Sequence, residues 1–297
     1  MGRLFKAFVF KLGRDLTFRI TLIIGIGMAV LMTLLYLGVD LAMETFGTDG
    51  RMLSGPNMLL NSLSPVQNFG IAIPVNLISF TCLEFTQGTI RNKIIAGNSK
   101  FKIYASLCIS GLIFAFSLLL VYVGLCTLLG TIVGGFDLNL PIMVGMAQSP
   151  VNGAYIGLTL LFAALTYVSL VMFAIFMATL LRNIGPSIPV VMVALMLLYF
   201  GAYLVSAMSY FFEDSPIVII MKIINPLYAL SGGVEYHTVQ ATMNGVPLFN
   251  DDGTPIMVTD YVYYATDTIV CSIVNNIVYA ALFFGFGSLI FTKRDVK

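Results

Sequence analysis

The chain has 297 residues, of which 59% are hydrophobic and only 10% are charged. Its mean hydropathy is +0.96, and because an average soluble domain carries about 25% charged residues, a water-soluble globular protein is excluded. Fifteen Lys and Arg against fourteen Asp and Glu give a net charge of +1, which leaves no excess of cations to neutralise several phosphates and argues against nucleic-acid binding.

Apolar stretches without charges predict six membrane-spanning helices, since a helix that crosses a bilayer needs about 20 mostly apolar residues. Stretches of this kind cover residues 20–39, 66–83, 103–133, 154–181, 188–211 and 268–291. The second is the weakest because it contains Gln67, Asn68, Pro74 and Asn76, and we expect it to be bent, or to face protein and water rather than lipid. The predicted fold class is an all-α polytopic membrane protein, with residues 1–297 as one transmembrane domain.

The distribution of Lys and Arg over the connecting segments predicts the orientation. If the N-terminus is cytoplasmic, only Arg51 and Lys222 of the fifteen Lys and Arg lie outside. Cytoplasmic loops carry an excess of these cations. We therefore expect a multi-pass protein of the cell membrane with both termini in the cytoplasm and with residues 40–65, 134–153 and 212–267 outside.

The N-terminal segment predicts an interfacial elbow helix within residues 1–19. At about 100° per residue, the first 14 residues place Arg3, Lys6, Lys11 and Arg14 on one side and bulky apolar residues on the other. Such a helix lies in the membrane interface with its cations near anionic headgroups. It either only anchors the first span, which we favour, or also touches a cytoplasmic partner.

The largest polar segment on the predicted cytoplasmic side is the loop of residues 84–102. Gly88 interrupts it, residues 89–95 have the composition of a short helix, and Gly97 with Asn98 suits a left-handed cap at the end of that helix.

The composition of this short helix indicates a binding surface. Ile90, Ile94 and Ile95 supply more apolar surface than a free cytoplasmic loop tolerates. Arg91 and Lys93 project from the same helix and suit an acidic partner surface. The alternative is that these cations only reflect the excess of Lys and Arg that cytoplasmic loops carry, and that the loop binds no partner.

The outer segment of residues 212–267 is divided in two by its composition. Residues 216–230 are apolar, but Lys222 and Pro226 interrupt them, so the uninterrupted stretch is too short to span a membrane. The segment is also too apolar to lie in water. It therefore predicts re-entrant or interfacial helices that protein covers. Residues 235–267 are acidic and rich in turns, and they predict a solvated cap rather than a calcium loop, because the alternating ligands of an EF-hand are absent.

The residues of catalytic and ion-coupling chemistry are missing. The sequence has no G-x-x-x-x-G-K-[ST] loop, its only histidine is His237, and its four cysteines are far apart, so no catalytic residue, metal site or cofactor is predicted. No charged residue lies well inside a span, which argues against a proton- or sodium-coupled carrier. Uncharged polar residues and sixteen Met suit an amphipathic substrate instead. The predicted pathway residues are Asn68, Asn76, Asn275 and Asn276.

The 84–102 loop resembles the cytoplasmic loop of type-2 ATP-binding cassette (ABC) transporter permeases. The resemblance is carried by Glu84-Phe85, by GTIRNKIIAG from Gly88 to Gly97 and by Ser99-Lys100, and the basic end FTKRDVK is similar to the way many of these permeases end. It implies a homodimer of the permease with two separate ATPase subunits, which bind ATP and Mg and receive a coupling helix. The residues it assigns to that contact are Glu84, Gly88, Thr89, Ile90, Arg91, Asn92, Lys93, Ile94 and Gly97.

The function that these features predict is that of the membrane subunit of an ATP-driven exporter, itself not an enzyme, for an amphipathic peptide, toxin, antimicrobial or drug. A secondary carrier or channel that works without an ATPase is the alternative. A membrane-embedded enzyme or assembly factor is a third reading, disfavoured because no constellation of acid, base or metal ligands is present. The outer region is longer than that of the simplest members of the family, so no particular substrate is transferred from a relative.

Overall fold

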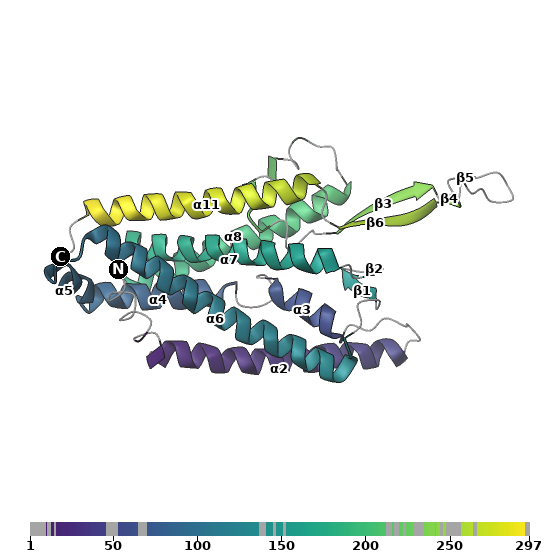
Figure 1. Cartoon of the computed structure of the whole chain (residues 1–297), viewed down its shortest axis with the longest axis horizontal. Coiled ribbons are helices and arrows are strands. Elements are labelled where there is room, and N and C mark those ends of the chain that lie inside the picture. Colours follow the sequence, from purple (N-terminus) through teal and green to yellow (C-terminus); the bar gives the residue numbers. More distant parts are fainter. Residues whose placement is uncertain are drawn as a thin grey trace.

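The computed structural model of the chain is a bundle of long helices that run side by side (Figure 1). It describes residues 10, 13–14, 16–45, 53–64, 70–136, 141–144, 147–150, 153–211, 216, 220–221, 224–227, 234–240, 242–243, 246–247, 257–263 and 266–294. Within these residues, five helices are long and apolar enough to cross a membrane. They are α2 (Leu16–Thr45), α6 (Lys100–Gly134), α7 (Gly153–Leu181), α8 (Ile184–Phe211) and α11 (Thr266–Lys293). A helical, multi-pass membrane protein is thereby confirmed.

The predicted second span is not one helix in the structure. The helix α4 (Ala72–Thr86) covers residues 72–83 of it, and a separate short helix, α3 (Gly55–Leu63), comes before it and runs in the same direction along the bundle (Figure 1). Neither has the roughly 20 residues of a span. Asn57 and Met58 of α3 are buried, and α3 packs on α6, while the position of residues 40–65 outside the membrane stays a prediction. The six predicted spans are therefore not confirmed.

Glycines allow α3 to approach α6 closely. Gly130 and Gly134 lie one turn apart near the end of α6, a spacing typical of closely packed membrane helices. A Cβ atom on Gly134 would overlap the carbonyl oxygen of Leu53, and one on Gly130 would lie 2.6 Å from Cγ of Met58. The backbone N–H of Leu53 also donates to Oδ2 of Asp40 on α2, at 2.8 Å. The start of α3 is thus fixed to both neighbouring helices.

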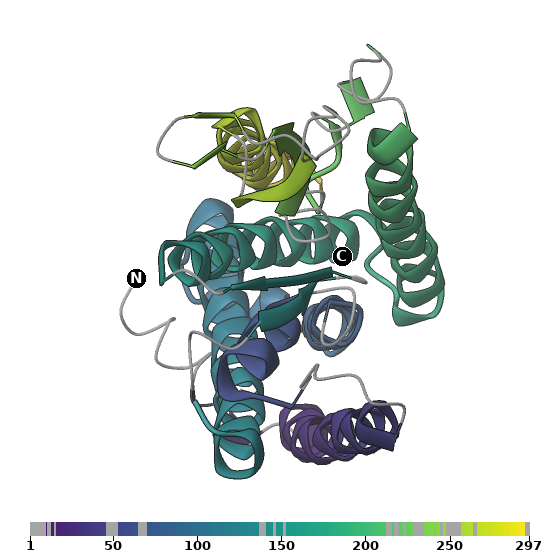
Figure 2. The same ribbon diagram turned by 90° about the vertical axis from the view of Figure 1, so that its right-hand side faces the viewer.

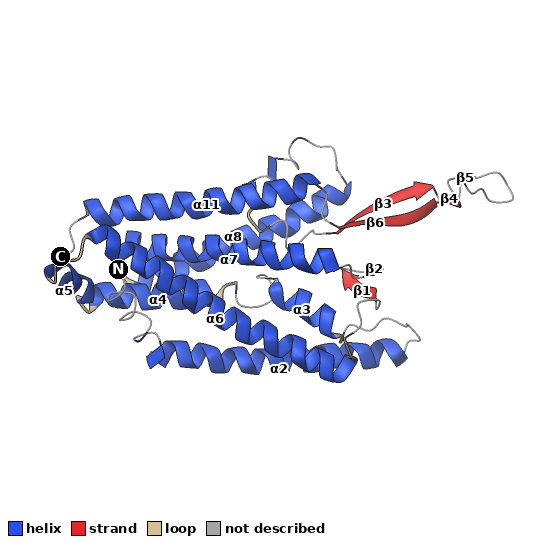
Figure 3. Cartoon of the chain, in the orientation of Figure 1, coloured by secondary structure: helices blue, strands red, loops and turns tan. Residues whose placement is uncertain are grey.

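The two ends of the bundle differ (Figure 3). One end carries the short helix α5 (Thr89–Ile95), and α2 begins and α11 ends there (Figure 1); we name it the α5 end. The other, the hairpin end, carries antiparallel strand pairs that the sequence analysis did not predict. They are β1 (Pro141–Val144) with β2 (Ala147–Pro150), β3 (Val234–Gln240) with β6 (Met257–Tyr263) and β4 (Thr242–Met243) with β5 (Val246–Pro247).

A turn between α8 and α11 is buried inside the bundle. Nδ2 of Asn225 donates to the carbonyl oxygen of Leu198 at 2.9 Å, near the middle of α8. The hydroxyl of Tyr279 on α11 donates to the carbonyl oxygen of Ile224 at 2.7 Å, and Leu227 is fully buried. Asn225, Pro226 and Leu227 of the predicted re-entrant segment are therefore buried against the bundle, whereas Ile220 and Ile224 are exposed.

The predicted elbow helix lies largely outside the described residues. Phe10, Gly13 and Arg14 have helical backbone, and the guanidinium carbon of Arg14 is 4.3 Å from the ring centre of Phe10. The orientation of the bundle and of both termini relative to the membrane stays a prediction.

The close contact of α3 with α6 makes a testable prediction. Ala at Gly134 should destabilise the protein by about 1–3 kcal/mol because the added methyl group has no space. Gly124 is the matched control on α6, since a Cβ atom there meets nothing within 4 Å and Ala favours a helix over Gly by roughly 0.8–1 kcal/mol. Thermal unfolding in detergent should show a lower Tm for Gly134→Ala and an equal or higher Tm for Gly124→Ala. Equal Tm values for the two variants would show that α3 does not pack here.

Candidate functional site

The short helix predicted over residues 89–95 is present with these bounds as α5. Glycines make the turns on both sides of it, with φ of 68° at Gly88 and 84° at Gly97, a conformation that other residues adopt at a cost. Nδ2 of Asn98 donates to the carbonyl oxygen of Lys93 at 3.0 Å and so satisfies one of the last carbonyls of the helix. The left-handed turn expected at Gly97 is therefore confirmed.

A buried ion pair ties α5 to the end of α4. The side chain of Glu84 is 0% exposed, and its Oε2 lies 2.6 Å from Nζ of Lys93. The hydroxyl of Thr89 lies 2.5 Å from the same oxygen and 2.9 Å from the backbone oxygen of Glu84. A buried carboxylate is costly unless it is paired and hydrogen-bonded. This arrangement therefore fixes the position of α5 relative to α4.

The ion pair changes the surface that was predicted for docking. Lys93 was expected to face a partner together with Arg91, but it points back into the bundle and only 20% of its side chain is exposed. Ile90 is fully buried and Ile94 packs against the core, so the chain itself covers most of the apolar surface that seemed to need a partner. Ile95 is still 73% exposed. The exposed side chains of α5 are those of Arg91, Asn92 and Ile95.

Cations bind the ends of the neighbouring helices beside α5. Nζ of Lys100, at the start of α6, lies 3.0 Å from the carbonyl oxygen of Thr292 and 3.2 Å from that of Arg294. Nη1 of Arg294 donates in turn to the carbonyl oxygen of Leu180 at 2.7 Å. Cations stabilise the C-terminal ends of helices, where carbonyl groups lack helical partners. The start of α6 and the ends of α7 and α11 are thus held together.

Asn276, a predicted pathway residue, connects three segments of the protein. Only 1% of it is exposed. Its Oδ1 accepts from Ser169 on α7 at 2.9 Å, while its Nδ2 donates to the carbonyl oxygens of Pro226 at 3.2 Å and Ser272 at 3.0 Å. The amide group is engaged on both sides and holds the buried turn, and its place in a substrate pathway stays a prediction.

The other predicted pathway residues are not gathered around Asn276. Asn76 donates to the carbonyl oxygen of Ala72 at 2.8 Å within α4, and Asn275 is half-buried on α11. Seen along the bundle, α7 lies between α4 and α11 (Figure 2). Asn68 lies outside the described residues. Asn76 and Asn276 therefore lie on helices that α7 separates within the chain, and a shared pathway at a dimer interface stays a prediction.

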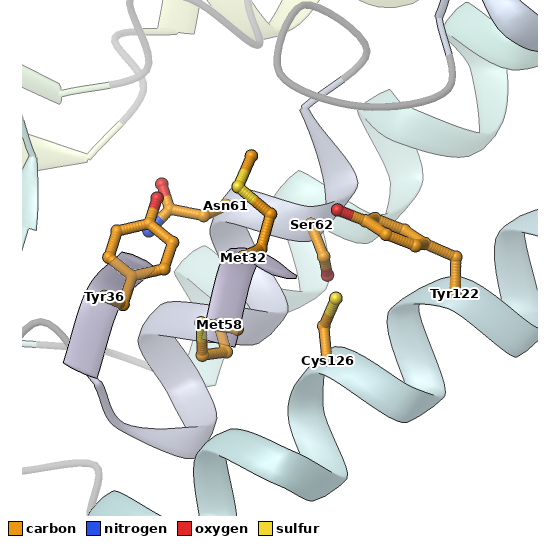
Figure 4. Close-up of a pocket in the computed structure, with 7 residues that line it drawn as sticks. All are labelled: Met32, Tyr36, Met58, Asn61, Ser62, Tyr122 and Cys126. Carbon is orange, nitrogen blue, oxygen red and sulfur yellow. The ribbon is translucent and has the colours of Figure 1, made fainter. Parts of the chain in front are cut away.

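A small polar pocket that the sequence analysis did not predict lies between α2, α3 and α6 (Figure 4). Its cavity volume is about 10 Å³, room for about one water molecule, and it is lined by Met32, Tyr36, Met58, Asn61, Ser62, Tyr122 and Cys126. The Ser62 hydroxyl and the Cys126 thiol point toward one another, and the phenol of Tyr122 points into the same space (Figure 4). Asn57 and Asn61 lie one turn apart in α3 and are hydrogen-bonded at 2.9 Å. Their spacing in the sequence is the signal that would have indicated a polar face on this helix.

An apolar cleft lies on another side of α3, toward α6 and α7. Its volume is about 630 Å³, and it is lined by Leu59, Leu63, Phe116, Leu119, Leu120, Val123, Gly124, Thr127, Leu128, Leu160, Ala163 and Ala164. Thr127 carries the only hydroxyl among these lining residues, and it donates within α6 to the carbonyl oxygen of Val123 at 2.7 Å. The cleft therefore offers hydrocarbon contacts, whereas the small pocket offers hydrogen bonds.

Comparisons of the chain with models of protein families, with curated proteins and with solved structures find no match. The described residues contain no group of three or more His, Cys, Asp or Glu that could hold a metal ion. The fold itself defines the class of protein as a helical, multi-pass membrane protein.

The buried ion pair predicts how two substitutions combine. Lys93→Met should destabilise the protein by about 3–5 kcal/mol because it leaves the Glu84 carboxylate buried without a cation. Adding Glu84→Leu should recover much of this loss, because no charge then remains to be paired. SDS unfolding in mixed micelles measures both variants, with Lys102→Met, an exposed lysine near the start of α6, as the control. If the double variant is less stable than Lys93→Met alone, the pair is not what holds α5.

Proposed function

We propose that the chain is the membrane subunit of a transporter driven by a separate ATPase, and that α5 is the element on which the ATPase docks. The observation that carries this proposal is the construction of the α5 end. A seven-residue helix is held by a buried ion pair, and it still presents Ile95, 73% exposed, next to the exposed cation Arg91. An apolar side chain beside a cation suits a groove with an apolar floor and an acidic rim.

The resemblance of residues 84–97 to the coupling segment of type-2 ABC permeases supports the same assignment. It implies two copies of the permease and two ATPase subunits, with ATP and Mg bound by the ATPase. The Glu84–Lys93 pair adds a physical route for coupling, because a force on α5 is transmitted to α4 through a contact with little freedom to slide. Coupling then needs α4 and α5 to move as one body.

The substrate that we propose is amphipathic. The small pocket beside α3 carries an amide and several hydroxyl groups, and the cleft toward α7 is lined almost entirely by hydrocarbon. Both sites share α3, and the residues that line them carry no formal charge. The cleft fits the apolar part of an amphipathic molecule better than a bare ion, whereas the small pocket has room only for a water-sized polar group.

The rival proposal is a carrier or channel that works without an ATPase. Its support is limited to the buried carbonyl and amide groups around residues 224–227, which are of the type that coordinates ions in some carriers. We favour the ATPase-driven transporter because those groups are already hydrogen-bonded to Asn276 and Tyr279.

Substitution on the exposed face of α5 tests the docking proposal. Arg91→Glu combined with Ile95→Glu should abolish the binding and stimulation of an ATPase encoded by a neighbouring gene, because both changes oppose an acidic, apolar groove. The exposure of both side chains predicts unchanged insertion and Tm. Lys102→Glu is the control, with a comparable charge change at an exposed position off α5. Normal binding and stimulation by the double variant would refute α5 as the docking helix.

Thiol labelling tests the proposed cytoplasmic position of the α5 end. In a variant without the natural cysteines, a cysteine in place of the exposed Phe136, at the hairpin end, should react with an impermeant reagent in whole cells. A cysteine in place of the exposed Asn92 on α5 should react only after the cells are opened. The reverse pattern would contradict the orientation that the distribution of Lys and Arg predicts.

A further inference from the structure

Four hydroxyl groups inside the bundle have no hydrogen-bond partner among the described residues. They belong to Thr166 and Tyr167 on α7, Tyr199 on α8 and Ser272 on α11. Thr166 and Tyr167 are 0% exposed, and Tyr199 and Ser272 are 6% exposed. A buried polar group without a partner costs about 1–3 kcal/mol. Four of them indicate a partner other than the side chains and backbone groups that the structure describes.

Contacts between helices place Thr166 and Ser272 at one level of the bundle. The helices α7 and α11 both run from the hairpin end to the α5 end (Figure 1), and Ser169 on α7 donates to Asn276 on α11 at 2.9 Å. Thr166 and Ser272 each lie one turn before these two residues. Both hydroxyls therefore belong to the same turn of the interface between α7 and α11.

The two tyrosines join this level to the neighbouring helices. The phenol groups of Tyr167 and Tyr199 are close enough to interact electrostatically, and so are those of Tyr167 and Tyr122. Tyr122 lines the pocket in Figure 4. Tyr199 follows Leu198, the residue whose carbonyl oxygen binds Asn225 of the buried turn. Polar groups thus follow one another from α6 through α7 and α8.

Threonine and serine in a membrane helix usually bond to a carbonyl of their own helix, and several in this chain do so. Thr159 donates to the carbonyl oxygen of Tyr155 at 2.8 Å, and Ser110 to that of Leu107 at 2.9 Å. The hydroxyls of Thr166 and Ser272 make no such hydrogen bond, although both residues lie inside a helix. Each of the four groups is a hydroxyl, which donates one hydrogen bond and accepts others, so a partner that both donates and accepts, as water does, matches all four.

We propose that Thr166, Tyr167, Tyr199 and Ser272 form a buried water-binding site. Its ordered waters bridge α7, α8 and α11, each making about three hydrogen bonds. The site goes beyond the proposed transport function, since it requires neither an ATPase nor a substrate. Hydrogen bonds through water hold the helices around residues 224–227 together. Unlike direct side-chain contacts, they can change partners when the helices move.

Radiolytic footprinting tests for the water directly, because hydroxyl radicals formed from bound water oxidise adjacent buried side chains. The probe is ¹⁸O-labelled water with the wild-type protein in lipid nanodiscs. Tyr167 and Tyr199 should incorporate ¹⁸O several-fold faster than Tyr104, which is equally buried but donates to the carbonyl oxygen of Phe283. Phe162, fully buried on α7, is the apolar control. Incorporation at both tyrosines as slow as at the two controls would overturn the site.

Removal of single hydroxyls gives an independent readout. In a dry site, Tyr167→Phe and Tyr199→Phe remove an unsatisfied polar group and should raise the Tm. In a hydrated site, each removes a hydrogen bond to water and should lower the Tm, as Tyr279→Phe should by losing its bond to the carbonyl oxygen of Ile224. We expect a fall for both variants. A rise for either one would overturn the proposal, whatever the footprinting shows.

Discussion

The structure depends on one constraint, which is that backbone polar groups at membrane depth must find partners within the protein. Long helices meet it by themselves, but the turn at residues 224–227 does not. There the carbonyl oxygens of Ile224 and Pro226 accept hydrogen bonds from Tyr279 and Asn276, and the N–H of Leu227 donates to Oδ1 of Asn225 at 2.9 Å. Asn276 and Tyr279, two polar residues of the mostly apolar helix α11, thus hold the turn at residues 224–227 against the bundle.

The same constraint explains the start of α3. A short helix exposes unpaired N–H groups at its beginning, and the chain supplies acceptors for them. Asp40 binds the N–H of Leu53, Ser54 binds that of Asn57 at 3.4 Å, and the carbonyl of Gly135 accepts from Gly55 at 2.9 Å. Because α3 is held in this way, one part of its surface forms the polar pocket with α2 and α6 and another forms the apolar cleft with α6 and α7.

At the α5 end, several charged side chains are used in contacts within the chain and are not available to a partner. Glu84 pairs with Lys93, while Lys100 and Arg294 bind helix-end carbonyls. The count of cations that predicts orientation therefore overstates the number available for docking. A small exposed face on a rigidly held helix transmits force better than a mobile basic loop would, and this is the physical basis for our proposal that α5 is the coupling helix.

Local patterns in the sequence predicted the long helices and α5, since hydropathy and the glycines at 88 and 97 act within a few residues. They did not predict α3, whose burial depends on Gly130 and Gly134, far away on α6. The pairing of Lys93 and the role of Asn276 likewise depend on which groups meet in space. The strands β3 and β6 were missed for another reason: the stretches VEYHTVQ and MVTDYVY are rich in β-branched and aromatic residues, a signal that was available.

The most direct measurement of the central claim is flux of a fluorescent amphipathic peptide across proteoliposomes that contain the purified chain. The account predicts flux when the ATPase encoded by a neighbouring gene is reconstituted with the chain and ATP is added, and none with either protein alone. It also predicts loss of that flux when Glu replaces Arg91 and Ile95. Flux by the chain alone, driven by an ion gradient and indifferent to ATP, would contradict it.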